Sequence, residues 1–423
     1  QLGSLFASQM HEGTLSAAFG VVLLLAGMTA PPGAVSNYHS PTALALSPDG
    51  QKLYVADQTQ EAVATVAVAA GKVTGAIPVA DPRALALSPD GKTLYVASGD
   101  RDEVVKIDVS SRRVVARAEA HRQPAGLTLS ADGRTLYCCN QFSDDVLVYE
   151  AASLKRTARL PVVREPRCCA LSPDGKTLAV ANHLPLGSNL DDGLGAVLSL
   201  YDLTGGGAHQ VQLARGATDV GQVVCSADGR YAFVVHVLAR WLVPPTQLER
   251  GWIATNALTI VDLTQRQRVN TVLLDDLDRG AANPWALALS PDGKTLYSTH
   301  AGTDEVQIMD TAKLLKLVTE RPTNSPTALE DDLTAVYRAG VRQRVACGGI
   351  GPRADPDRPQ RTPGVERADA AAAQRRQRRP AGPARHVLQA GAAGHDDVRR
   401  GAHHVFGVDT RKRPQLRADH VDQ

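Results

Sequence analysis

Short apolar runs recur along the chain in a pattern that repeats about every 42 residues. Each copy has an apolar run, a Ser-Pro-Asp-Gly or Ser-Ala-Asp-Gly turn and a second apolar run, as in residues 43–46 and 53–56. Asp-Gly between two such runs predicts a hairpin, because glycine takes positive φ without a Cβ clash and aspartate bonds its own backbone. The spacings of the six copies are 41, 42, 42, 54 and 64 between their turn aspartates, Asp49, Asp90, Asp132, Asp174, Asp228 and Asp292.

Two more apolar runs complete each copy. A third run follows the second, as in residues 104–109, and a fourth follows the third, as in residues 113–117. Four strands in about 42 residues make one blade of a β-propeller. Because a four-stranded blade cannot bury both of its faces alone, blades must stack around an axis. We therefore expect an all-β chain with six recognisable blades of a seven-bladed ring over residues 37–354.

The pattern changes after the sixth blade. Residues 314–320 and 329–339 predict short helical pieces, and residues 341–346 predict an outer strand. Gly-Pro-Arg-Ala at 351–354 then matches Asp-Pro-Arg-Ala at 81–84, which opens a seventh copy that stops at Ala354. With suitable codons, a shift of one nucleotide turns the next residues into Leu-Thr-Leu-Thr-Ala-Pro-Ser-Gly. We therefore predict a frameshift near Ala354, with an out-of-frame, low-complexity and disordered tail over 355–423.

Charge is distributed unevenly about the same point. Residues 1–354 hold 32 Lys and Arg against 35 Asp and Glu, whereas residues 355–423 hold 14 against 9. An alternative to the frameshift is an evolved basic tail that binds nucleic acid. The tail lacks interleaved aromatic residues and any folding pattern, so we expect no nucleic-acid partner.

The N-terminus carries a separate apolar run. Residues 17–26 are apolar apart from Gly20, and Pro31, Pro32 and Gly33 follow. Ten residues are too few to span a bilayer but suit the core of a secretory signal. We expect residues 1–36 to be a signal peptide or a disordered N-terminus, and the protein to be periplasmic, secreted or on the cell surface without stable membrane insertion. The alternative is a strand that closes the fold.

The two long spacings have insertions at equivalent places. The excess of 12 residues in blade 4 and 22 in blade 5 falls after the second strand, at 183–195 and 237–256. Such loops leave the same face of a propeller as the connections from one blade to the next, so one face carries both. Tryptophan and arginine dominate binding hot spots, and we expect a protein partner here; the alternative is that the indoles plug the channel. The candidate residues of the insertions are His183, Trp241, Arg250 and Trp252.

Equivalent positions at the start of the inner strands hold Arg83, Arg167 and Trp285. Inner strands line the channel, so the arginines could form a cationic mouth for a carboxylate or phosphate. The alternative is local pairing, because Asp81 and Glu165 each lie two residues before an arginine.

Histidines close the second strands of the last two blades, at His236 and His300. They could bind a metal, but hydrogen bonding within the loops is the alternative that we favour. We expect no metal site and no cofactor in this chain, because phosphate-loop, dinucleotide, zinc-protease and haem-attachment motifs are all missing from the sequence.

Four of the six cysteines form two adjacent pairs, Cys138 with Cys139 and Cys168 with Cys169. Neighbouring residues of a strand point to opposite faces, so neither pair can chelate one ion. We expect small buried side chains, with a disulfide between blades as an alternative if the protein is exported.

The strands themselves resemble a known family. Leu-Tyr-Val-Ala at Leu53 and Leu94 and Val-Lys-Ile-Asp at Val105 are similar to the YVTN-type β-propeller repeat, whose rings usually have seven blades. The blade 5 insertion, with residues 273–285 and 299–305, resembles an exported bacterial subgroup in which a di-haem cytochrome-c-peroxidase-like domain follows the ring. The resemblance implies that a haem domain is lost downstream of this ring. We expect a non-catalytic, exported binding or scaffold protein that uses the insertion face and docks a cytochrome-c-type redox domain. The alternative is a lactonase-like hydrolase with its site at the channel mouth, because seven-bladed lactonases also resemble this repeat.

Overall fold

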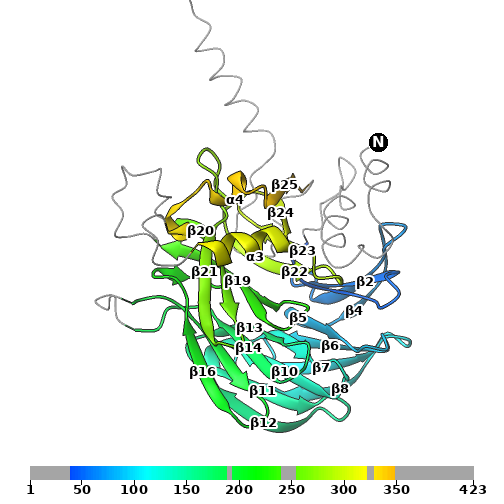
Figure 1. The fold of residues 1–423 in the computed structure, drawn as a ribbon. Coiled ribbons are helices and arrows are strands. Elements are labelled where there is room, and N and C mark those ends of the chain that lie inside the picture. Colours follow the sequence, from blue (N-terminus) through cyan, green and yellow to red (C-terminus); the bar gives the residue numbers. More distant parts are fainter. Residues whose placement is uncertain (1–38, 188–192, 240–253, 322–327, 348–423) are drawn as a thin grey trace, which may run out of the picture. The chain divides into compact units, whose positions relative to one another are not determined.

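The repeats fold into successive antiparallel sheets of four strands, in which each strand pairs with the next along the chain (Figure 1). The computed structural model describes residues 39–187, 193–239, 254–321 and 328–347. The predicted segments 1–36 and 355–423 lie outside the described residues. The first three blades consist of β1 (Pro41–Leu46), β2 (Lys52–Asp57), β3 (Ala62–Ala67), β4 (Lys72–Pro78), β5 (Pro82–Leu87), β6 (Thr93–Ser98), β7 (Glu103–Asp108), β8 (Arg113–Glu119), β9 (Pro124–Leu129), β10 (Thr135–Asn140), β11 (Asp145–Glu150) and β12 (Lys155–Pro161).

The next three blades follow the same order, with additions. Blade 5 has its inner strand in two pieces, and blade 6 has helices between its third and fourth strands. No helix in the described ranges is long and apolar enough to cross a membrane. The elements are β13 (Pro166–Leu171), β14 (Thr177–Asn182), β15 (Val197–Asp202), β16 (Gly207–Gln212), β17 (Ala217–Thr218), β18 (Val223–Cys225), β19 (Tyr231–Ala239), β20 (Ala254–Asp262), β21 (Gln267–Leu273), β22 (Pro284–Leu289), β23 (Thr295–His300), β24 (Glu305–Asp310), α3 (Thr311–Glu320), η3 (Leu329–Asp331), α4 (Ala335–Arg338) and β25 (Arg342–Ala346), with a further 3₁₀ turn, η1 (Gln141–Ser143), in blade 3.

The predicted hairpin turn is confirmed in every blade. In the first, the amide of Gly50 donates to the carbonyl of Ser47 at 2.8 Å, and the Asp49 carboxylate accepts from the Ser47 hydroxyl and from the amide of Gln51. Gly50 has φ of 69°, and the glycine of each of the other five turns has φ between 69° and 71°. The turn is thus closed by the aspartate and by a backbone shape that glycine adopts easily.

Blade 5 departs from the other blades at one end. β19 and β20 continue their ladder to the pair Ala239 with Ala254, three residues past His236, where the second strand was expected to end. The predicted insertion of 237–256 is therefore partly strand, and residues 240–253 lie outside the described part. The backbone between β17 and β18 bulges, with Asp219 at φ of 50°.

Apolar layers lie between neighbouring blades. The first layer joins Tyr54 and Val63 of blade 1 to Leu94 and Val105 of blade 2, and further layers repeat this arrangement along the series. In blade 6, α3 is capped by Asp310, whose carboxylate accepts from the amide of Lys313 at 3.0 Å, and packs its buried side chains into the layer shared with blade 5. Inner strands pack on one another in chain order, from β1 through β5, β9, β13 and β18 to β22.

Candidate functional site

An arginine, a histidine, an aspartate and a tryptophan from three blades meet on the face that carries the insertions. Arg167 is the second residue of β13, His183 follows β14, Asp219 lies in the bulge of blade 5, and Trp285 is the second residue of β22. The guanidinium carbon of Arg167 lies 3.6 Å from the centre of the Trp285 ring, which is a cation–π contact. We call these four residues the Arg167 cluster.

Hydrogen bonds fix the histidine of this cluster. His183 Nδ1 lies 3.2 Å from Arg167 Nη1, and His183 Nε2 lies 3.3 Å from Asp219 Oδ1. Burial and the charge of Arg167 lower the pKa of His183, so the neutral ring prevails near pH 7. Nδ1 also lies 3.2 Å from the carbonyl oxygen of Val220, so this nitrogen faces both a donor and an acceptor, whereas Nε2 faces the carboxylate of Asp219.

A glycine lets blade 6 approach this cluster. A Cβ placed on Gly221 would lie 2.6 Å from the carbonyl oxygen of Trp285 and 3.0 Å from that of Pro284. Because Gly221 has no side chain, the inner strand of blade 6 passes directly over blade 5, and Trp285 reaches Arg167 of blade 4. The cluster therefore depends on packing between blades.

A second charged group lies at the equivalent position of blade 2. Arg83 Nε lies 2.7 Å from Asp81 Oδ2, and the Gln58 amide donates to Asp81 Oδ1 at 2.5 Å. The carboxylate of Asp81 raises the pKa of the neighbouring Asp100. Arg83 thus makes the local ion pair with Asp81 that was the alternative to an open cationic mouth. In blade 4, Glu165 instead accepts from Gln141 at 3.0 Å.

His236 and His300 are fully buried between blades. His236 Nε2 lies 2.7 Å from the hydroxyl of Thr259, and His300 Nδ1 lies 3.0 Å from the carbonyl oxygen of Ala281. Burial lowers the pKa of His236 to about 4 and that of His300 to about 3, so both rings are neutral near pH 7. Neither ring is open to a solute at the channel mouth in this conformation.

Three candidate residues, Trp241, Arg250 and Trp252, lie outside the described residues. All six cysteines are free, and four of them are buried, as expected for small core side chains. Across the described ranges there is no group of three or more His, Cys, Asp or Glu side chains placed to hold a metal ion.

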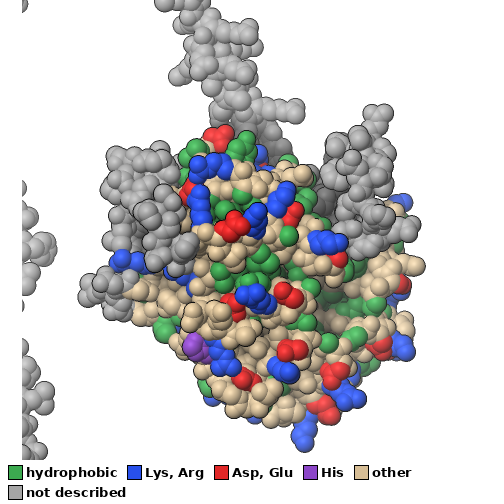
Figure 2. Space-filling view, in the orientation of Figure 1, with side chains coloured by type: hydrophobic (Ala, Val, Ile, Leu, Met, Phe, Trp, Pro, Cys, Tyr) green, Lys and Arg blue, Asp and Glu red, His purple; other side chains and the backbone are tan. Residues whose placement is uncertain are grey.

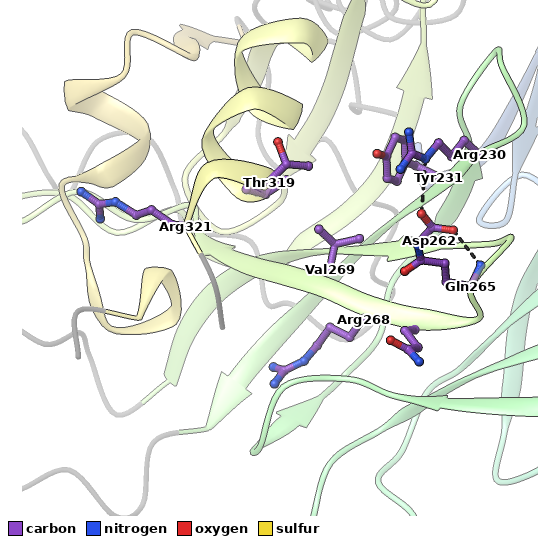
Figure 3. A pocket seen from close by; sticks show the side chains of 10 residues that line it. Arg230, Tyr231, Asp262, Gln265, Arg268, Val269, Thr319 and Arg321 are labelled. Carbon is purple, nitrogen blue, oxygen red and sulfur yellow. Dashed lines mark hydrogen bonds and ion pairs between the residues drawn. The ribbon is translucent and has the colours of Figure 1, made fainter. Parts of the chain in front are cut away.

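A groove of about 280 Å³ lies at the opposite end of blade 5, where β19 begins and β20 ends (Figure 3). Arg230 Nε lies 3.3 Å from Asp262 Oδ2, and its guanidinium stacks 4.9 Å from the centre of the Tyr231 ring. Arg268, on another wall, pairs with Glu330 at 2.9 Å. The groove was not predicted, because its walls combine the blade 5 strands β19, β20 and β21 with α3, which lies outside the repeat.

Charged side chains of both signs are interspersed over the face of the molecule in Figure 2, without a large patch of one sign. This includes the surface around α3 and β21. Asp219 was not predicted as a site residue, because its contact with His183 joins two different blades. The repeat did offer one signal, since Asp219 aligns with Asp81: each lies nine residues before the aspartate of its hairpin turn.

The sheet order and the four-stranded blades define this chain as an all-β propeller. Two family models match parts of it: the SMP-30/Gluconolactonase/LRE-like region over residues 78–183, and the seven-bladed β-propeller lactonase over residues 16–114. The predicted propeller fold is confirmed by these matches and by the structure.

Comparison with individual proteins gives one relative of known name. The chain is 31% identical over 155 residues to hydrazine synthase subunit beta of Kuenenia stuttgartiensis; the match spans 37% of this chain and 40% of that protein. The solved structure of Kuenenia stuttgartiensis hydrazine synthase superposes with a TM-score of 0.68 and 27% identity, covering 76% of this chain and 91% of that one.

Proposed function

We propose that this chain is a non-catalytic, exported β-propeller that binds a protein partner through the face with the blade 4 and blade 5 insertions. The observation that carries the proposal is the Arg167 cluster, in which an arginine stacks on a tryptophan 3.6 Å away on that face. Stacked arginine and tryptophan side chains are held in place before a partner arrives. They therefore lose little conformational freedom on binding, which favours affinity.

The relative named above supports this proposal, because it is a subunit of an enzyme and so belongs to an assembly. The resemblance to exported YVTN propellers extends the proposal to the partner. We infer a cytochrome-c-type redox domain, with no cofactor in the propeller itself, in the periplasm or at the cell surface.

The state of the buried histidines also favours a non-catalytic role. A general base must come within hydrogen-bonding reach of its substrate. His236 and His300 lie at 0% exposure between blades, and Arg83 is engaged by Asp81. The groups first considered for a hydrolytic site are thus held by internal contacts.

Replacement of Arg167 by alanine tests the partner face. We expect the affinity for the native partner, isolated with the chain from its source, to fall at least about tenfold, because a central anchor is lost. Arg134→Ala is the matched control, since Arg134 has a side chain 86% exposed beside the hairpin turn on the opposite face. Unchanged affinity in Arg167→Ala, in a protein of unchanged melting temperature, would contradict the proposal.

A lactonase-like hydrolase at the channel mouth is the alternative function. The two family-model matches favour it, and so does the contact of His183 with Asp219, since a histidine held by a carboxylate can act as a base. The test is hydrolysis of a panel of lactones by the full chain. Turnover that falls at least about a hundredfold in His183→Gln, but not in Arg134→Ala, would replace the binding proposal by this one.

A further inference from the structure

The four paired cysteines divide between the layers that separate the blades. Cys139 and Cys169 belong to one buried cluster between blades 3 and 4, together with Leu178 and Val180. Cys138 lies in the layer between blades 2 and 3. This division follows from the alternation of side chains along a strand, which sends adjacent cysteines to opposite faces.

The other member of the blade 4 pair points the opposite way. Cys168 Sγ accepts from the amide of Val223 at 3.3 Å and lies 3.7 Å from the carbonyl oxygen of Gly221, both in blade 5. Cys168 is therefore on the far side of its strand from Cys139. Of the four pairings that the sequence allows between these cysteines, only Cys139 with Cys169 shares a layer.

A glycine brings the two strands close at this point. Cys139 of β10 is the direct partner of Gly126 on β9. A Cβ on Gly126 would lie 2.6 Å from the carbonyl oxygen of Arg167 and 2.8 Å from the Cα of Cys168, so the backbone of β13 occupies the place where a side chain would stand. The Thr128 hydroxyl of β9 also donates to the carbonyl oxygen of Cys169. The inner strand of blade 4 is thereby held against blade 3.

The two thiols interact directly across this layer. Burial and the neighbouring Cys169 raise the pKa of Cys139 well above its ordinary value, whereas a hydrogen bond from Cys139 lowers that of Cys169. At the equivalent positions of other blades the sequence has Ala56 with Leu85, and Ala97 with Leu127. At these two aligned positions, among the described blades, only the interface of blades 3 and 4 has a cysteine on both sides.

We propose that Cys139 and Cys169 form a disulfide that joins blade 3 to blade 4. One thiolate attacks an external disulfide, such as oxidised glutathione or the disulfide form of a protein oxidant, and forms a mixed disulfide while one external thiolate leaves. The second thiolate then attacks the protein sulfur of the mixed disulfide and displaces the other external thiolate. Two thiols lose two protons and two electrons, and the external disulfide becomes two thiols. Both sulfurs are buried, so the exchange takes place during folding or when this layer opens. The proposal stands whether or not the insertion face binds a partner.

The test uses the full chain, refolded in a buffer of reduced and oxidised glutathione. After denaturation and thiol labelling we expect four free thiols, against six in dithiothreitol, and a cross-linked peptide that contains residues 138–139 and 168–169. The oxidised form should melt about 5 °C higher, because the bond restricts the unfolded chain. Six free thiols in both buffers would overturn the proposal.

Alanine variants assign the bond, and alanine is the residue that other blades carry at the position of Cys139. The double variant Cys138→Ala with Cys168→Ala should keep the cross-link and the difference in melting temperature. Cys139→Ala should lose both. A cross-link that persists in Cys139→Ala would also refute the assignment. Because the thiol count of the wild-type chain needs no variant, the proposal can be tested even if a variant fails to fold.

Discussion

The free energy of unfolding should depend on pH through two single residues, His236 and His300. Burial lowers their pKa values to about 4 and about 3, from the ordinary value of about 6.5. Below about pH 6.5 the unfolded chain takes up protons at these sites, whereas the folded chain does not until the pH falls to the lowered values. The stability that these residues contribute is therefore full above pH 6.5 and is lost as the pH falls.

We expect the free energy of unfolding to decrease by about 2 kcal/mol per histidine between pH 7 and pH 5. Urea unfolding over this range measures the slope. His236→Gln should flatten it by its own share, and His209→Gln, the same substitution in an exposed outer strand, is the control. A slope that is the same in all three proteins would show that His236 is protonated in the folded state.

Single residues were predictable where their chemistry is local. Asp49 and Gly50 were read correctly, because the hydrogen bonds of that turn lie within five residues. The contact of Arg167 with Trp285 was not predicted, since it joins positions 118 residues apart and depends on the missing side chain of Gly221. Repetition showed that the two positions are equivalent but not that they touch.

Strands and helices were predicted more fully than sites. Four strands in each blade, two helical pieces after β24 and an outer strand after them all follow from short apolar runs, and the structure confirms each. The division of the inner strand of blade 5 into β17 and β18 was not predicted, because β17 pairs with Val237 and Leu238, which belong to the unexpected extension of β19. The extra length of β19 and β20 was likewise assigned to a loop.

The outer strand of blade 6 is held by buried ion pairs although helices separate it from the rest of its blade. Arg344 Nη1 lies 2.7 Å from Asp276 Oδ2, and Arg344 Nη2 lies 2.6 Å from Glu305 Oε2. The side chain of Glu305 is 1% exposed, and that of Arg344 is 10% exposed. Arg342, on the same strand, also pairs with Asp276.

Arg344→Met should lower the free energy of unfolding by about 3 to 5 kcal/mol, because it leaves a buried carboxylate short of a partner. The double variant Arg344→Met with Glu305→Met should recover much of that loss, since both charges are then gone. Denaturant unfolding of the two proteins measures the difference. An equal loss in both would mean that the ion pair is not what anchors β25.

For the whole molecule, the series of blades has two ends within the described residues. The side of blade 1 that faces away from blade 2 has an apolar cluster with members from blade 1 alone, including Leu53, Val55 and Val66. By contrast, the four apolar clusters that lie between neighbouring blades from blade 1 to blade 5 each contain residues of two blades. A seventh blade would supply the missing half of that layer, in agreement with the repeat that begins at 351–354.

If the chain is read out of frame after Ala354, as its sequence predicts, restoring the frame should raise the melting temperature by at least about 5 °C, because another apolar layer is buried. Thermal unfolding of the chain in each frame, at equal concentration, makes the comparison. Equal melting temperatures would contradict a missing blade, and an uninterrupted reading frame at the locus would remove the frameshift itself.

Blade 5 also breaks the near-symmetry of the ring. Its second and third strands run three residue pairs past the level at which those of blades 1, 2, 3 and 6 end, which at about 3.3 Å per residue is a rise of about 10 Å. A flat protein surface would contact little beyond this ridge, whereas a surface with a matching recess would bind in a single rotational orientation. For the partner proposed above, similar blades would not distinguish one rotational orientation from another, and the longer ladder of blade 5 would fix the orientation about the propeller axis.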